Sequence, residues 1–235
     1  MARLVRALAA VLFAAAVPLL IVTSTVRWLA TDETYMRHGF RAFDAAERTG
    51  LPQAEIDRAG AEVLAYFRND ADRLEITVTA DGQQQPLFSE REIAHMADVK
   101  ALIRAVFRLQ EVSLVVVLAY IALAVLWSGE TSPRTLAKLA LAGIGAGAVL
   151  TAGIAAFALT GFDQAWTTFH EIAFRNDLWQ LDPDTDRLIQ MYPEPFWQQT
   201  TYLAGAIIGG ACLAVAAACG AYLLRGPRER ERAAA

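Results

Sequence analysis

The chain contains only three histidines, His38, His95 and His170, and histidine is the side chain whose unperturbed pKa lets it exchange protons near neutral pH. His95 precedes one long apolar segment by about 12 residues, and His170 follows another by about 10. If both segments are membrane helices that continue outward, the two imidazoles stand at similar heights above the lipid and can meet. They are therefore the candidate acid–base pair. His38, flanked by Arg37 and Gly39, is predicted to be a surface residue.

Charged side chains accompany His95 on its predicted helix. Asp98 lies three residues further on and can share a helix face with His95, where a carboxylate fixes the tautomer of an imidazole. Lys100, Arg104 and Arg108 repeat every four residues along the same helix. We interpret these three cations as snorkelling to the lipid headgroups. The alternative is that they line a polar cleft for a headgroup or a peptide terminus.

Aromatic side chains accompany His170. Phe162, Trp166, Phe169 and His170 form a stripe at helical spacing. Aromatic rings gather at membrane interfaces, so one interpretation is an interfacial belt with a histidine at its polar end. The other interpretation is that the rings surround a functional His170. The residue pattern alone leaves both interpretations open.

Several chemistries have no motif in the sequence. There is no G-x-S-x-G, no P-loop and no H-E-x-x-H. The pair His170-Glu171 has no second histidine one turn further on, and no histidine lies inside an apolar segment, where a bis-histidine haem would need it. We therefore expect neither a metal nor a cofactor.

The distribution of charge predicts the elements that position these residues. Of all residues, 55% are hydrophobic and 20% charged, yet four windows contain no Asp, Glu, Lys or Arg: 7–26, 112–129, 139–162 and 195–224. About 20 apolar residues cross a bilayer as a helix. This pattern excludes an ordinary water-soluble protein, a disordered chain and a disulfide-stapled secreted domain. The predicted transmembrane helices lie at about 7–26, 107–127, 139–160 and 202–224.

Lys and Arg in the segments beside these helices predict the orientation, because cytoplasmic loops are enriched in both. The N-terminus, the loop between the second and third helices and the C-terminal tail hold 8 basic and 3 acidic residues. The other two loops hold 13 basic and 22 acidic residues. Both termini are therefore predicted to be cytoplasmic. We predict a single membrane domain, residues 1–235, with extracytoplasmic insertions at 27–106 and 161–201.

The first insertion is long enough to fold on its own. Helices are expected at residues 32–44 and 51–67, and residues 74–79 alternate at period two, as a strand does. Residues 81–82 supply an Asp-Gly turn, and a return strand is expected around 86–88. The predicted fold class is an α-helical integral membrane protein with four transmembrane helices and a small α+β extracytoplasmic cap, made of helices plus a β-hairpin.

Three further patterns predict local structure. Ser89 and Glu92 fit a capping box at the start of the helix that carries His95. Asp182 and Pro183 fit an N-cap followed by proline, opening a short helix that must end before Pro193. A G-x-x-x-G pair in each of the third and fourth helices predicts that these two helices pack closely together.

Three stretches of sequence are distinctive in combination: His95-Met-Ala-Asp-Val-Lys100, Phe169-His-Glu-Ile-Ala-Phe-Arg-Asn-Asp-Leu-Trp179 and the continuation from Asp182 to Phe196. Together they resemble the bacterial lipoprotein intramolecular transacylase (Lit) family of four-helix membrane proteins. The resemblance covers the whole topology, but its specific motifs sit in 89–100 and 169–197. Arg175 departs from the pattern, since an apolar or aromatic residue is more often expected there.

The resemblance implies an acyl transfer within one substrate. The sn-2 acyl chain of the diacylglyceryl group on a lipoprotein's N-terminal cysteine moves to that residue's own α-amine, which gives a lyso-form lipoprotein. The implied catalytic residues are His95 and His170, one as the base and the other assisting at the carbonyl, with the assignment left open. We add five supporting residues, which are Asp98, Lys100, Asn176, Asp177 and Trp179.

The expected partners are a diacylglyceryl-modified lipoprotein and membrane lipid, with no nucleic acid. The expected location is the bacterial cytoplasmic membrane, with the site on its outer face. Two alternatives remain open. One is an interfacial acyl hydrolase or transferase acting on phospholipid, and the other is a non-catalytic membrane protein whose outer cap binds a partner.

Overall fold

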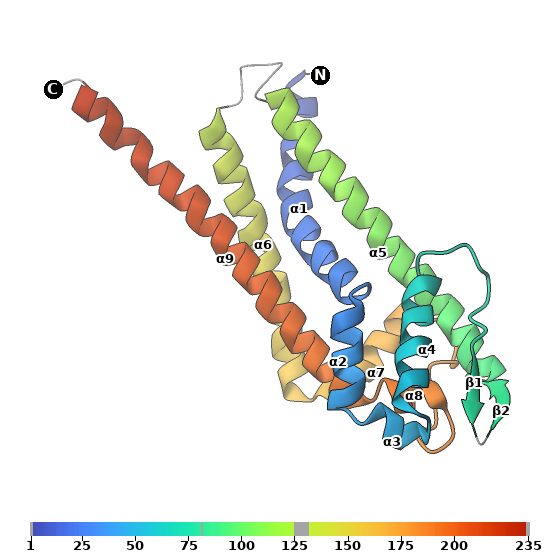
Figure 1. Ribbon diagram of the computed structural model, residues 1–235. Coiled ribbons are helices and arrows are strands. Elements are labelled where there is room, and N and C mark those ends of the chain that lie inside the picture. The colour runs from blue at the N-terminus through green and yellow to red at the C-terminus, as the bar shows by residue number, and fades with distance from the viewer. Residues whose placement is uncertain (1, 81, 125–131, 234–235) are drawn as a thin grey trace. The chain divides into compact units, whose positions relative to one another are not determined.

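The structure is a computed structural model that describes residues 2–80, 82–124 and 132–233. Within these residues the chain is mostly helical, with a single two-stranded sheet (Figure 1). The elements, in chain order, are α1 (Ala2–Leu29), α2 (Glu33–Ala42), α3 (Ala45–Thr49), α4 (Gln53–Tyr66), β1 (Thr77–Ala80), β2 (Gln83–Pro86), α5 (Glu90–Ala122), α6 (Pro133–Thr160), α7 (Phe162–Ala173), α8 (Arg187–Met191) and α9 (Glu194–Ala233).

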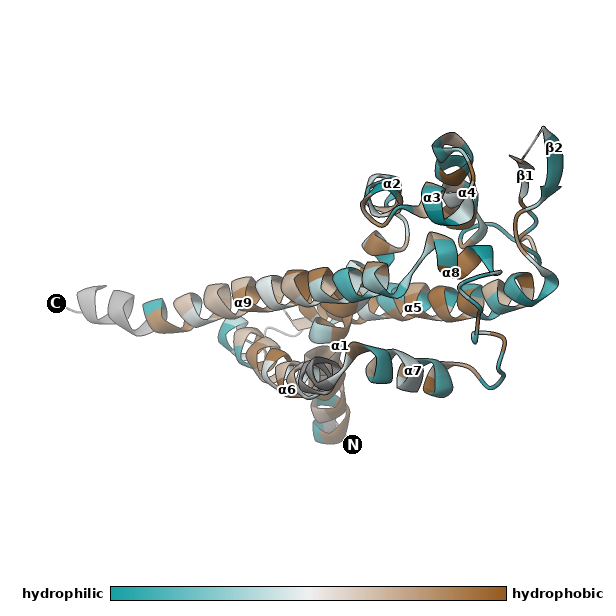
Figure 2. Cartoon of the chain, turned by 90° about the horizontal axis from the view of Figure 1, so that it is seen from below, coloured by the Kyte–Doolittle hydropathy of each residue, from teal (hydrophilic) through white to brown (hydrophobic). Residues whose placement is uncertain are grey.

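Four helices are long and apolar enough to cross a membrane, and they occur where the uncharged windows predict them. The candidate spans are Arg3–Leu29, Glu90–Ala122, Pro133–Gly153 and Glu194–Arg225. The predicted fold class is therefore confirmed. Figure 2 shows apolar residues prevailing along the middle of α9, while β2 is polar. In α5 the predicted membrane segment begins near Phe107, so the charged first half of this helix, with His95, lies outside that segment.

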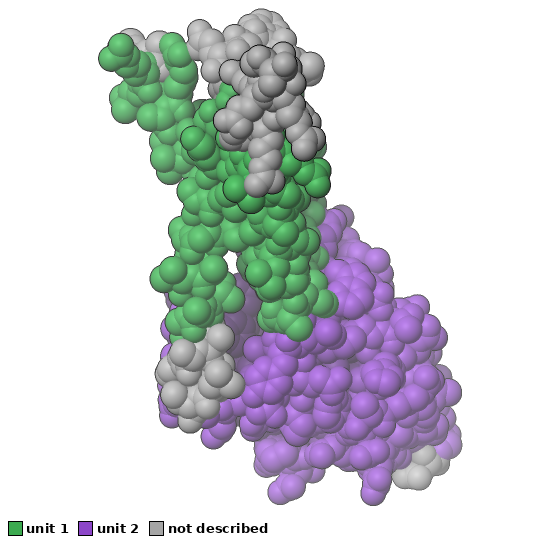
Figure 3. Space-filling model, turned by 90° about the vertical axis from the view of Figure 1, so that its left-hand side faces the viewer, with its two compact units in different colours: residues 1–25, 107–156, 205–235 green, residues 26–106, 157–204 purple. Residues whose placement is uncertain are grey.

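The chain divides into two compact units (Figure 3). Unit 1 holds the larger part of the four long helices, in residues 1–25, 107–156 and 205–235. Unit 2 comprises residues 26–106 and 157–204, and therefore contains both His95 and His170. The assignment of all 235 residues to one membrane domain stays a prediction.

Within unit 1, the glycine pair of α6 packs against α1. A Cβ atom added to Gly143 would lie 1.9 Å from the carbonyl oxygen of Ala14, and one added to Gly147 would lie 2.9 Å from Cβ of Pro18. The corresponding glycines of α9, Gly205 and Gly209, have no such neighbour within 4 Å among the described residues. The glycines of α6 and α9 therefore do not pack on each other among the described residues, and α6 and α9 are joined instead by a hydrogen bond of 2.9 Å from the guanidinium of Arg134 to the carbonyl of Leu223. G-x-x-x-G spacing marks a surface that allows close approach and does not identify the partner.

The core of unit 2 is built by α2, α4, α8 and the strands. Phe40, Ile56 and Met191 are fully buried in it. The two predicted helices of the first insertion are confirmed as α2 and α4. Asp32 caps α2, because its Oδ1 accepts from the backbone N–H of Tyr35 at 2.6 Å.

The hairpin is confirmed, although its strands lie nearer the turn than predicted. β1 and β2 are antiparallel, with Thr77 opposite Pro86 and Ala80 opposite Gln83. Gly82 has φ of 77°, the left-handed conformation that a tight turn requires. Asp81, the other residue of the predicted turn, lies outside the described residues.

The alternation in residues 74–79 reflects burial as well as pairing. Leu74 and Ile76 are buried in the core of unit 2 ahead of β1, and Leu87 and Phe88 are buried just after β2. Among the described residues, a single bond continues the ladder beyond the strands, from the N–H of Leu87 to the carbonyl of Ile76 at 2.8 Å. Side-chain packing therefore produces the period of two over a longer stretch than strand pairing does.

Near the site, one prediction about the helices is wrong, and one condition for the meeting of the two histidines is not met. The helix after Asp182 and Pro183 starts later, because α8 is capped at Asp186 and the preceding residues form a turn. The N–H of Asp182 instead bonds Oδ2 of Asp186 at 2.8 Å. The third long helix does not continue to His170: α6 ends before Gly161 and α7 begins after it. α8 does end before Pro193, as predicted.

α5, in contrast, runs unbroken from Glu90 to Ala122 and begins with the predicted capping box. The N–H of Ser89 donates to Oε2 of Glu92 at 2.7 Å, and the N–H of Glu92 donates to Oγ of Ser89 at 3.3 Å. His95 is therefore held one turn beyond a well-satisfied helix start.

Candidate active site

The structure brings the two predicted catalytic histidines together inside unit 2. His95 comes from α5 and His170 from α7, and their ring centroids lie 6.2 Å apart with the ring planes inclined by 35°. Each residue is 6% exposed. The third histidine, His38, is exposed on α2, as the sequence predicts. The geometry thus isolates one buried pair of imidazoles.

Aromatic rings surround this pair. Trp166 lies one helical turn before His170 on α7, with ring centroids 4.5 Å apart, and Trp179 approaches His170 to 5.0 Å. Phe174 contacts both imidazoles, with centroids 5.1 Å from His95 and 5.6 Å from His170. Trp179 was predicted as a supporting residue, and the structure places its ring directly beside the pair. The rings make the surroundings of the pair apolar.

One hydrogen bond defines the tautomer of His170. Its Nδ1 lies 2.8 Å from the carbonyl oxygen of Trp166. A carbonyl can only accept, so Nδ1 must carry the proton and donate it. In the neutral ring Nε2 then keeps its lone pair, which is the form that a general base needs.

Burial favours the neutral form of both imidazoles. It lowers the pKa of His170, and the hydrogen bond to the Trp166 carbonyl partly opposes this shift. Burial lowers the pKa of His95 to about 4, with a smaller effect in the same direction from His170 and an opposing one from the carboxylate of Asp98. At neutral pH both rings are therefore uncharged.

His95 also presents a buried polar atom that the protein does not satisfy. Its Nδ1 has no hydrogen-bond partner among the described residues. Buried polar atoms are nearly always bonded, and an exception calls for an explanation. A substrate group that enters the pair can supply the missing bond.

The other supporting residues on this side tie α5 to the segment after α7. Nδ2 of Asn176 donates to Oδ2 of Asp98 at 2.8 Å. This bond goes to the carboxylate that we expected to orient His95, so the structure gives Asp98 a different partner. The side chain of Asp177 is exposed, and the backbone carbonyl of this residue accepts a hydrogen bond from the guanidinium of Arg91 at 2.6 Å. Together these contacts hold α5 and the 174–179 segment next to each other.

Lys100 lies in a different environment. Its Nζ donates to the carbonyl of Ala71 at 2.5 Å and to Oδ1 of Asn69 at 3.2 Å, and it sits 3.8 Å from the centre of the Tyr66 ring. Arg104 bonds the carbonyls of the same loop. Lys100 and Arg104 therefore hold the loop after α4 in place, which differs from both the snorkelling and the polar-cleft interpretations.

Sequence reasoning missed a second role for Glu92. This carboxylate is 2% exposed, and its Oε1 accepts from the N–H of Leu188 at 2.6 Å, at the start of α8. The capping box accounts for one of its oxygens and carries no signal for the other. Glu92 thus fixes α8 against the start of the helix that carries His95.

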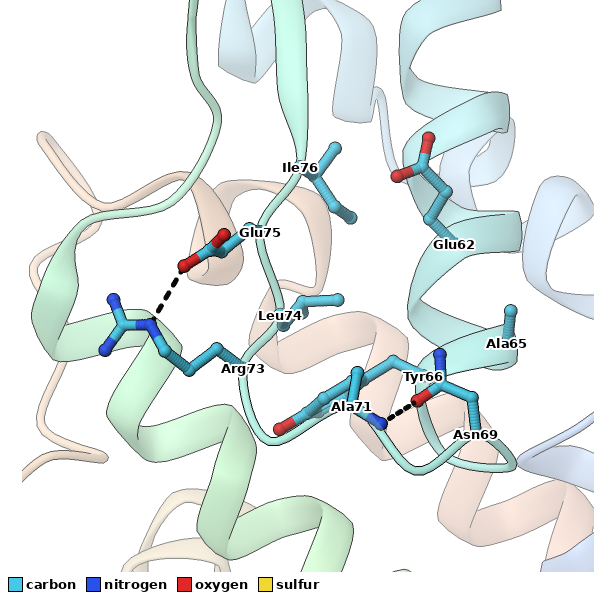
Figure 4. A pocket seen from close by; sticks show the side chains of 9 residues that line it. All are labelled: Glu62, Ala65, Tyr66, Asn69, Ala71, Arg73, Leu74, Glu75 and Ile76. Atoms are coloured by element: carbon cyan, nitrogen blue, oxygen red, sulfur yellow. Dashed lines mark hydrogen bonds and ion pairs between the residues drawn. The ribbon is translucent and has the colours of Figure 1, made fainter.

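A surface pocket of about 230 Å³ lies elsewhere in unit 2. It is formed between α4 and residues 69–76 (Figure 4), and Tyr66, Asn69 and Arg73 are among its lining residues. None of the predicted site residues lines it. In the part of the chain that the structure describes, no three His, Cys, Asp or Glu side chains gather in a way that would hold a metal ion.

Comparison with known families decides what this site belongs to. Residues 11–197 match the family model described as lipoprotein intramolecular transacylase Lit. The chain belongs to this family. The resemblance on which the sequence analysis relied is therefore confirmed, and so is the expectation of a membrane acyltransferase. None of the curated proteins matches the chain.

Solved structures of the membrane integral Lit from Bacillus cereus share the fold of this chain. One is 17% identical, with a TM-score of 0.75 over 97% of this chain and 100% of that one. Two others carry a single histidine replaced by arginine or by alanine. The arginine variant has 15% identity and a TM-score of 0.70, over 95% of this chain and 93% of that one. The alanine variant has 16% identity and a TM-score of 0.73, over 94% of both.

Proposed function

We propose that this Lit-family protein moves the sn-2 acyl chain of a diacylglyceryl-cysteine lipoprotein to the α-amine of the same cysteine. The bond between the acyl carbonyl carbon and the glyceryl sn-2 oxygen breaks, an amide bond forms between that carbon and the α-nitrogen, and the amine proton passes to the glyceryl oxygen. The product is a lyso-form lipoprotein. No water is consumed and no enzyme nucleophile is needed, since donor and acceptor belong to one molecule and binding alone brings them together.

The geometry supports different roles for the two histidines. The attacking amine must lose a proton, which requires a base with a free lone pair. His170 fits this role, because its Nδ1 donates to the Trp166 carbonyl and the lone pair therefore lies on Nε2. His95 fits the other role, since a neutral imidazole can donate an N–H to the oxygen that becomes negative at the ester carbonyl.

The observation that carries the proposal is the 6.2 Å separation of the two rings. At this separation one small reacting group can contact both imidazoles, with its amine nitrogen at His170 and its carbonyl oxygen at His95. The aromatic rings of Trp166, Phe174 and Trp179 support the same conclusion, because an apolar environment suits the acyl chain and strengthens each polar interaction with the reacting atoms.

The proposed location is the bacterial cytoplasmic membrane, with both termini in the cytoplasm and unit 2 on the outer side. The excess of Lys and Arg in the termini and in the loop between α5 and α6 supports this orientation. A lipoprotein receives its lipid in the same membrane that anchors the chain, so substrate and site share one plane.

The test is expression in a bacterium that leaves the α-amine of its lipoproteins free, followed by mass spectrometry of a lipoprotein's N-terminal peptide. We expect a peptide with unchanged total mass, one acyl chain on nitrogen and one left on the glyceryl group. Unchanged diacylglyceryl peptide despite good expression would rule out the transacylase. In the same cells, accumulation of lysophospholipid would indicate an acyl hydrolase or transferase acting on phospholipid instead.

The alternative of a non-catalytic cap is tested in the same assay. It predicts that the chain forms no lyso-form product, that His95→Ala and His170→Ala are silent, and that substitutions on exposed cap residues abolish function. Loss of product with both histidine variants, at normal expression, contradicts it.

A further inference from the structure

Helix α7 carries two neighbouring apolar stripes, and only one of them is covered by protein. Phe162, Trp166 and His170 recur every four residues, and the first and last of these are buried. The second stripe contains Phe169 and Ile172, three residues apart, which are 44% and 82% exposed. Large apolar side chains that are exposed next to each other form a patch, and such patches mark contacts with a membrane or another protein.

Few large apolar side chains of unit 2 are exposed. Among its described residues, the large apolar side chains that are exposed are Trp28, Phe169, Ile172 and Tyr202. Trp28 and Tyr202 belong to α1 and α9, which are candidate membrane spans. The rest of unit 2, from α2 to β2 and in α8, exposes none of them. In this respect α7 resembles the membrane helices more than the soluble part of its own unit.

The position of α7 along the chain explains this. The uncharged window of the third long helix runs from residue 139 to Phe162, which is the first residue of α7. Gly161 alone separates α7 from α6. A helix that begins one residue after an apolar segment of this length begins at the edge of the hydrocarbon layer.

We infer that α7 is an interfacial helix whose exposed stripe, Phe169 and Ile172, inserts among the acyl chains of membrane lipids. The opposite face is polar and holds the exposed side chains of Asp163, Gln164 and Glu171. Figure 2 shows both polar and apolar residues along α7. α7 contains no Lys or Arg, so apolar contact drives the insertion and anionic headgroups do not. The inference does not depend on the proposed acyl transfer. It places His170, on the adjacent stripe, at the depth where lipid esters lie.

The experiment measures the depth of single spin labels in the full chain. Ile172→Cys is compared with the neighbouring, exposed Glu171→Cys, both in a Cys212→Ser/Cys219→Ser background and in nanodiscs of phosphatidylcholine. We expect the label at 172 to be several-fold more accessible to molecular oxygen than to a water-soluble nickel chelate. The label at 171 should show the reverse. The values should not change when anionic phosphatidylglycerol is added to the nanodisc.

Two results would overturn the inference. Equal accessibility of both labels to the nickel chelate would place the stripe in water. Low accessibility of the label at 172 to both relaxing agents would show that protein, such as a second copy of the chain, covers the stripe. Neither outcome bears on lipoprotein acylation, which the mass-spectrometric assay measures separately.

Discussion

Helix α5 carries two buried polar side chains, Lys100 and His95, which differ in whether the protein satisfies their hydrogen bonds. Lys100 is satisfied on one face, with two oxygen acceptors and the Tyr66 ring around its ammonium group. His95, five residues earlier, has aromatic neighbours and an Nδ1 without any partner in the described part of the chain. The sequence suggested chemistry for both residues. The comparison indicates that the satisfied cation holds the fold, whereas the unsatisfied imidazole is available to a substrate.

The strongest test of this comparison is His170→Ala, which removes the proposed base. We expect lyso-form product to fall by about 10²–10⁴-fold, the usual contribution of a general base. Quantitative mass spectrometry of the lipoprotein peptide gives the rate, and thermal unfolding in detergent gives the stability. The control is His38→Ala, on an exposed residue of α2. Full activity in His170→Ala would show that the histidine pair has a structural role and no catalytic one.

The pH dependence of stability separates the histidine face from the lysine face. The pKa of His95 is about 4 in the folded state against 6.5 for an ordinary histidine, so between these values only the unfolded state takes up the proton. The contribution of His95 to stability, about 3 kcal/mol, is therefore fully present above pH 6.5 and is lost as the pH falls toward 4.

Unfolding is to be measured at pH 7 and at pH 4.5 in the parent, in His95→Gln and in His38→Gln. We expect the loss between the two pH values to shrink clearly in His95→Gln and to stay the same in His38→Gln. An unchanged loss in His95→Gln would mean that the imidazole is not held neutral by burial.

Lys100→Met tests the other face. The carbonyl of Ala71 and the amide oxygen of Asn69 lose their donor, so we expect a stability loss of about 1–3 kcal/mol. The activity per folded molecule should stay within about twofold of the parent's, because Lys100 bonds the loop after α4 and contacts neither histidine. The matched control is Arg68→Met, an exposed cation beside the same loop whose side chain bonds none of the described residues. A large loss of activity without a loss of stability would show that Lys100 supports the catalytic site, as the sequence predicts.

The sequence predicts those parts of this molecule that depend on local pattern. Uncharged windows gave the four long helices, and Ser89 with Glu92 gave the start of α5. The meeting of His95 and His170 followed from their similar distances to the membrane, even though a break at Gly161 makes the second helix a separate one.

Contacts between residues distant in the chain escaped prediction. Lys100 bonds a loop about 30 residues earlier, and Glu92 bonds the N–H of Leu188 in the second insertion. A periodic pattern shows which side of a helix is polar but not which segment will cover it, because tertiary packing decides that. The same limit explains why the glycines of α6 were assigned to α9 when they face α1.

Tyr192 tests whether every buried polar atom without a partner belongs to the active site, and its substitution should have the smallest effect. Its hydroxyl is buried without a partner among the described residues, as is Nδ1 of His95, and burial raises its pKa. It differs in position, because it is part of the hydrophobic core of unit 2, where its ring contacts Phe40 and Phe196.

An unpartnered hydroxyl in such a core only carries a desolvation cost, so Tyr192→Phe should raise stability by about 1 kcal/mol and leave the yield of lyso-form product unchanged. Thermal unfolding and the lipoprotein assay measure the two quantities on the same preparation. Lower activity at equal or higher stability would instead show that the hydroxyl bonds the substrate. Tyr192 would then join the histidine pair, and the catalytic surface would extend from α7 to the end of α8.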